Sequence, residues 1–111
     1  MRFGLKEETI QKINTVFASF PEVDEAILYG SRAKGNYKPG SDIDITLKGN
    51  GLKLDVENKI GLLIDDLSLP YLFDISVYNH LKDADLIDHI KRVGIVFYKR
   101  LDVTNNSNSA N

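Results

Sequence analysis

Apolar residues recur along the chain at spacings that alternate between those of helices and those of strands. Ile10, Ile13 and Phe17 lie three to four residues apart, which predicts an amphipathic helix over residues 6–19. Residues 23–29 follow and contain a short, continuous apolar run. Such a run is typical of a strand that is buried on both faces. The chain is therefore expected to begin with a helix that leads into a buried strand.

The same alternation continues beyond a basic, glycine-rich connection. Strands are predicted over residues 42–47, 71–78 and 95–98, because apolar and β-branched residues predominate there. Helices are predicted over residues 56–67 and 86–93, where apolar residues return to helical spacing. Helices and strands that alternate in this way predict an α/β (α+β) domain, in which helices cover a small mixed β-sheet.

Composition limits the classes of protein to which the chain can belong. It has 111 residues, of which 42% are hydrophobic and 27% charged, values typical of one globular domain. Residues 1–102 are expected to form that domain, and the small polar residues 103–111 a disordered tail. No apolar stretch is long enough to span a membrane, and the start of the chain does not resemble a secretion signal, so a cytoplasmic protein is expected.

Charge and cysteine content exclude further kinds of chemistry. The net charge of -2 argues against a domain that grips nucleic acid by itself, because phosphate contacts usually require a basic surface. The chain contains no cysteine, which excludes disulfides, thiolate zinc sites and a cysteine nucleophile.

Two aspartates interrupt the strand predicted over residues 42–47. Asp42 and Asp44 are separated by one residue, so in a strand they point the same way, roughly 6.5 Å apart along the chain. Their carboxylates repel each other, and aspartate is a poor strand former. A bound cation would offset both costs, and magnesium typically takes one or two carboxylates together with substrate phosphates.

A third aspartate occupies a comparable place on the next predicted strand. Asp74 lies between Phe73 and Ile75, on the face opposite to these apolar residues. If the two strands are neighbours, three carboxylates converge on one surface of the sheet. Such a set suits two divalent ions that stabilise the attacking and leaving oxygens of a phosphoryl displacement. An edge-strand charge that prevents aggregation is the alternative interpretation of Asp74.

A glycine and a serine follow the strand predicted over residues 23–29. Gly30 permits a tight turn and a close approach of the backbone to a ligand. If a helix opens at Ser31, its free N–H groups favour a phosphate. Arg32 follows at once and is a candidate phosphate ligand, although a solvated basic loop is the alternative.

Several other polar residues are expected to be structural. Lys34 and Lys38 are expected to be solvated, and His80 and His89 have no ligand partner at useful spacing. Tyr37 follows the phosphate turn closely enough to stack on a base, although tyrosines are more often packing residues.

The motif that combines these residues resembles that of a known superfamily. Residues 30–35, Gly-Ser-Arg-Ala-Lys-Gly, precede the Ser-Asp-Ile-Asp of residues 41–44. This pattern resembles the signature of the DNA polymerase beta nucleotidyltransferase superfamily. The short chain and its third aspartate on a later strand resemble the minimal nucleotidyltransferase (MNT) branch. The resemblance extends over residues 7–98 and implies a polymerase-beta-like nucleotidyltransferase core.

The resemblance also implies an activity. In this family the residues that match Asp42, Asp44 and Asp74 are catalytic and bind two Mg²⁺ ions. Those that match Gly30 and Ser31 contact the phosphates of the nucleotide, which implies ATP as substrate. MNT proteins of this kind are antitoxins of HEPN-domain ribonuclease toxins, onto a tyrosine of which they transfer AMP. The resemblance therefore implies a protein adenylyltransferase with a HEPN toxin as its partner.

Two other functions are compatible with the sequence. A non-catalytic antitoxin would neutralise its partner by contact alone. An enzyme of the aminoglycoside nucleotidyltransferase type would modify a small cationic molecule, but we expect no second domain that could form the acidic pocket it needs. Larger nucleotidyltransferases carry such a domain, so we expect self-association or a partner protein to complete the site.

Overall fold

Helices and strands alternate along the chain, as the sequence predicts. The computed structural model describes residues 1–101, and the predicted tail, 103–111, lies outside them. The elements are, in order, α1 (Glu7–Ala18), β1 (Glu25–Tyr29), α2 (Gly30–Lys34), β2 (Ile43–Lys48), α3 (Leu54–Asp66), β3 (Phe73–Val77), the 3-10 helix η1 (Tyr78–His80), α4 (Ala84–Val93) and β4 (Ile95–Lys99). Within the described residues, no helix has the length and apolar character needed to cross a membrane.

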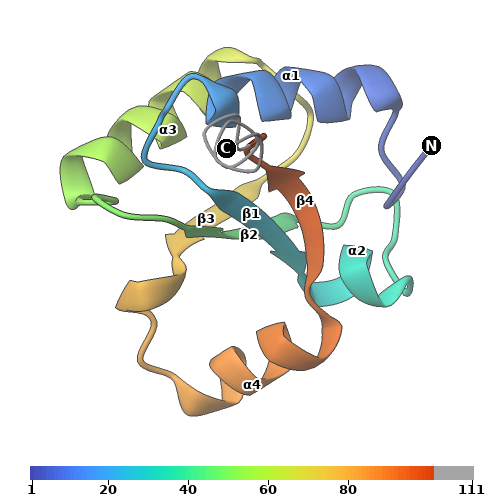
Figure 1. Cartoon of the computed structure of the whole chain (residues 1–111). Coiled ribbons are helices and arrows are strands. Elements are labelled where there is room, and N and C mark those ends of the chain that lie inside the picture. Colours follow the sequence, from blue (N-terminus) through green and yellow to red (C-terminus); the bar gives the residue numbers. More distant parts are fainter. Residues whose placement is uncertain (102–111) are drawn as a thin grey trace, which may run out of the picture.

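The four strands form one mixed sheet in the order β3-β2-β1-β4. β1 pairs antiparallel with β2 on one side and with β4 on the other, whereas β2 and β3 are parallel. The predicted small mixed sheet is thereby confirmed. Figure 1 shows α1 and α3 together above one face of the sheet and α4 below the other. The fold consequently has three layers, with helices on both faces.

The face of the sheet beneath α1 and α3 carries the main hydrophobic core. Ile43, Ile45 and Leu47 alternate along β2 and are fully buried on this face. Ile13 and Phe17 of α1 pack into the same core, as their predicted helical spacing requires. Burial of these side chains provides most of the hydrophobic stabilisation of the domain.

The opposite face is more polar and is only partly covered. Ile27 and Tyr29 of β1 pack there against Ile90 of α4 in a second, smaller cluster. Beside Ile27, Thr46 of β2 is fully buried and accepts a hydrogen bond of 3.0 Å from the Ser76 hydroxyl of β3. The polar character of this face therefore continues across the sheet from one strand to the next.

The observed element boundaries differ from the predicted ones at β2. The strand begins at Ile43, whose N–H donates to the carbonyl of Leu72 at 2.9 Å, so Asp42 lies just outside the strand. The β1–β2 ladder reaches only to the pair of Tyr29 and Asp44. Asp42 therefore belongs to the connection between α2 and β2, and this connection pairs with no strand of the described sheet.

Candidate active site

The sheet brings two of the predicted carboxylates into one row. Asp44 of β2 is the register partner of Asp74 of β3 and, on its other side, of Tyr29 of β1. Register partners in a sheet share a face and lie on strands about 4.8 Å apart. Asp42 precedes this row by two residues and is exposed, as is Asp74. The predicted adjacency of the strands that carry Asp44 and Asp74 is therefore confirmed.

The electrostatics of this row show that negative charge accumulates there. Burial, Asp74 and Asp42, in that order, raise the pKa of the Asp44 carboxyl, whereas His89 opposes them. Burial and Asp74 likewise raise the pKa of the Tyr29 hydroxyl. A cation would relieve the repulsion that makes ionisation of Asp44 costly.

The donor atoms of the row suit a hard cation. Within residues 1–101, no group of three or more His, Asp or Glu side chains is assembled so that it could hold a metal ion by itself. Mg²⁺ does not require such a cage, since it commonly keeps water and substrate phosphates beside one or two carboxylates. The carboxylates of Asp44 and Asp74, which the sheet brings into one row, therefore suit an ion that its substrate would complete, with Asp42 just before the row.

Gly30 lies directly against the row, at the junction of β1 and α2. Its φ of +74° favours glycine, and a Cβ atom at this position would collide with Oδ2 of Asp44. Its backbone N–H donates to Nε2 of His89 at 3.1 Å. The structure thus places Gly30 beside the Asp44 carboxylate and directs its N–H to His89, whereas the sequence predicts a backbone that approaches a phosphate. Ser31 follows in the first turn of α2 and is half-buried.

Arg32 has surroundings that the sequence does not predict. Its side chain is buried, with 2% of its surface exposed. The guanidinium donates to the carbonyls of Phe3 at 2.8 Å, of Ser41 at 2.8 and 3.1 Å and of Pro39 at 3.3 Å. Instead of standing free beside the phosphate turn, Arg32 ties the start of the chain to the residue before Asp42.

Two tyrosine rings complete the environment of Arg32. The guanidinium carbon lies 5.3 Å from the ring centroid of Tyr37 and 5.0 Å from that of Tyr71. Stacking on aromatic rings is a common arrangement for a guanidinium that lacks a carboxylate partner. Tyr37, considered for base stacking, contacts Arg32 in this way. Lys34 and Lys38 are exposed, as predicted.

His89 and Tyr29 belong to the site, although the sequence suggested only structural roles. His89 of α4 accepts the Gly30 hydrogen bond, and its ring meets that of Tyr29 edge-on at a centroid distance of 6.1 Å. Helical spacing from Leu86 offered a signal, because it places His89 on the face of α4 that packs toward the sheet. His80 is exposed in η1, outside the helix that carries this spacing.

Comparisons with known proteins agree with this arrangement. The family model described as polymerase beta, nucleotidyltransferase, matches residues 11–102. No curated protein matches the chain significantly. A putative nucleotidyltransferase from Sulfolobus solfataricus is 25% identical, with a TM-score of 0.50, over 85% of this chain and 86% of its own.

Two toxin–antitoxin complexes contain chains of similar fold. One, a complex with AMP-PNP, is 19% identical over 86% of this chain and 75% of the other, with a TM-score of 0.59. The second is a tri-AMPylated HEPN toxin from Shewanella oneidensis in complex with its MNT antitoxin. The matched chain of this complex is 15% identical over 86% of this chain and 74% of its own length, with a TM-score of 0.58.

Proposed function

Because the chain belongs to the polymerase beta nucleotidyltransferase family, we propose that it transfers AMP from ATP to a hydroxyl group of a partner protein. The observation that carries this proposal is the row of Asp44 and Asp74 across β2 and β3, with Asp42 just before it. We extend to this chain the antitoxin role named for its structural neighbours. The partner is then a HEPN toxin, and the acceptor is a tyrosine of that toxin.

The three aspartates have the central task in this proposal. Asp42, Asp44 and Asp74 would hold two Mg²⁺ ions, which when bound neutralise the charge of the triphosphate and favour ionisation of the acceptor hydroxyl. Asp74 is exposed at the outer end of the row and is the group that accepts the proton of this hydroxyl. The acceptor oxygen forms a bond to the α-phosphorus while the bond to pyrophosphate breaks.

The neighbouring residues position the nucleotide and the carboxylates. Ser31 binds the β- and γ-phosphates through its hydroxyl and the backbone N–H groups of the first turn of α2. Gly30 leaves the space that the Asp44 carboxylate occupies. Arg32 acts indirectly, because its bonds to the Ser41 carbonyl fix the residue that precedes Asp42.

Label transfer to a partner tests this function. The chain is co-expressed with a HEPN-domain protein and incubated with Mg²⁺ and α-labelled ATP, and the intact masses of both chains are measured. We expect AMP-sized increments on the partner, and none with the Asp42→Ala/Asp44→Ala variant. The matched control, Asp24→Ala/Asp55→Ala, removes two exposed carboxylates that lie outside the row. Neutralisation of the partner by the first variant, without label on either chain, would identify a binding antitoxin instead.

A further inference from the structure

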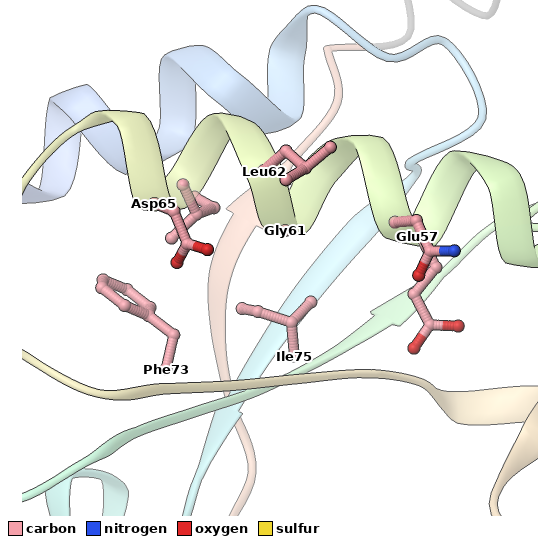
Figure 2. A pocket seen from close by; sticks show the side chains of 8 residues that line it. Glu57, Gly61, Leu62, Asp65, Phe73 and Ile75 are labelled. Atoms are coloured by element: carbon pink, nitrogen blue, oxygen red, sulfur yellow. The ribbon is translucent and has the colours of Figure 1, made fainter.

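A groove of about 550 Å³ lies between α3 and β3, on the face of the sheet opposite to the carboxylates. Figure 2 shows Phe73 and Ile75 of β3 beneath it and Leu62 and Gly61 of α3 above it. Leu62 is 64% exposed although it is a large apolar residue. A Cβ atom on Gly61 would meet nothing within 4 Å, so the absence of a side chain there keeps this part of the groove open. The groove therefore has apolar residues along β3 and polar as well as apolar ones along α3, and no side chain of the described residues fills it.

The same groove borders an open strand edge. In the sheet of residues 1–101, β3 pairs with β2 alone. The Leu72 carbonyl accepts from the N–H of Ile43 in β2. In a parallel strand, the backbone groups of successive residues point alternately toward the paired strand and away from it. The N–H and C=O groups of Phe73 and Ile75 consequently face away from the sheet. Such an edge is a template for an added strand.

Charge distinguishes between the strands that could be added. Glu57 and Asp65 of α3 flank the apolar residues, and the described residues that line the groove include no lysine or arginine. A second copy of the chain, docked through the same groove, would bring these carboxylates toward their own counterparts. A segment that carries lysine or arginine would instead neutralise them.

The alternation of side chains connects the groove with the carboxylate row. On β3, Phe73 and Ile75 face the groove, whereas Asp74 between them faces the other side of the sheet. A strand paired with β3 continues this alternation, about 4.8 Å beyond β3. One residue of such a strand would lie beside Asp74 while its two neighbours enter the groove.

We propose that the β3 edge and its groove bind the acceptor segment of the partner protein as an added strand. The segment is extended, and its groove-facing residues are apolar at the centre and basic at the ends. The residue between the apolar ones carries the hydroxyl that receives AMP. This inference rests on the proposed function, because it names the part of the substrate that the same site recognises.

The probe for this surface is the peptide Lys-Thr-Val-Tyr-Val-Thr-Lys, acetylated and amidated, with Glu in place of Lys as the control peptide. Binding to the full chain is measured by titration calorimetry in the absence of ATP and Mg²⁺. We expect the Lys peptide to bind more tightly than the Glu peptide. N-methylation of alternate backbone nitrogens of the peptide blocks strand addition on one of its two edges. It should abolish binding when the methylated edge is the one that faces β3.

Charge reversal on α3 provides the decisive variants. Glu57→Lys/Asp65→Lys should weaken binding of the Lys peptide about tenfold and reverse the preference between the two peptides. Asp55→Lys/Asp66→Lys is the matched control, because it reverses two exposed carboxylates of the same helix that do not line the groove. Gly61→Leu should fill the groove and remove binding, with the helix retained. Equal effects of the two double variants, or binding that survives Gly61→Leu, would overturn the proposal.

Transfer of label to the peptide tyrosine separates this proposal from the proposed function. Groove-dependent binding without transfer of AMP to the peptide would refute the acceptor role of the docked strand, and label on the HEPN partner then decides separately whether the enzymatic role stands. Transfer that Glu57→Lys/Asp65→Lys does not impair supports the enzyme and refutes this docking surface. Self-association of the chain that Gly61→Leu disrupts would assign the groove to a second copy and likewise refute the proposal.

Discussion

The two faces of the sheet share the same strands but differ in what covers them. Beneath α1 and α3, Ile43 and Ile45 are fully buried in the main core. On the other face, Asp44 sits between these two residues in a row with Asp74, and α4 covers only part of the surface. One short strand thus contributes to stability on one side and to the site on the other. Neighbouring residues of β2 should consequently respond to substitution in opposite ways.

The largest expected effect is on the polar face. Asp44→Asn preserves the size of the side chain but removes the charge that we assign to metal binding. Transfer of AMP should fall by about a thousandfold, equivalent to about 4 kcal/mol in the transition state. Single-turnover labelling measures the rate, and circular dichroism verifies the fold. A rate within threefold of that of the unsubstituted chain would exclude Asp44 from the chemistry.

The matching substitution on the apolar face is Ile45→Ala. Truncation of this fully buried side chain should lower the free energy of unfolding by about 2–5 kcal/mol. Urea denaturation measures the loss, and transfer per folded molecule should stay nearly unchanged. Ile45→Val is the control, with an expected cost of about 0.5–1.5 kcal/mol. A large loss of transfer in folded Ile45→Ala would show that the two faces are not independent.

A smaller effect is expected at Arg32, which contributes both to stability and to the position of Asp42. Arg32→Lys keeps the charge but cannot reproduce the bonds to Phe3 and Ser41, so the free energy of unfolding should fall by about 1–3 kcal/mol. Transfer should slow because Asp42 is held less firmly, whereas the KM for ATP should change little. A strongly raised KM without loss of stability would instead make Arg32 a nucleotide ligand. Lys34→Ala, exposed on the same helix, is the control.

The smallest effect concerns the dependence of stability on pH. The folded state raises the pKa of Asp44 above its unfolded value of about 3.9. The contribution of Asp44 to the free energy of unfolding is therefore complete below the unfolded pKa and is lost as pH rises through the folded pKa. In metal-free buffer, Asp44→Asn should therefore gain stability relative to the unsubstituted chain across that window. Partial exposure limits the gain to less than about 1 kcal/mol. Thermal unfolding of both proteins at a series of pH values measures it; a constant difference would contradict the prediction.

Local pattern was sufficient to predict most of this architecture. The alternation of helices and strands, and the position of each of Asp44 and Asp74 opposite the apolar residues of its own strand, follow from periodicity that each segment carries in itself. That the two strands are neighbours is information that only the fold supplies. The role of Arg32 does not, because its partner Phe3 is remote in sequence and no local spacing connects them. The contact between His89 and Gly30 likewise depends on how α4 returns to β1. Long-range hydrogen bonds of this kind leave no periodic trace in a sequence.

The bond from Arg32 to Phe3 has a practical consequence for anyone who produces this protein. Leu5 is fully buried and the Phe3 carbonyl is a partner of Arg32, so the opening residues brace the connection that carries Asp42. Removal of Phe3 would take away this acceptor and loosen the brace without touching any carboxylate. Preparations that lack Phe3 and Leu5 should then be less competent in transfer than preparations that keep them, although all three aspartates are present.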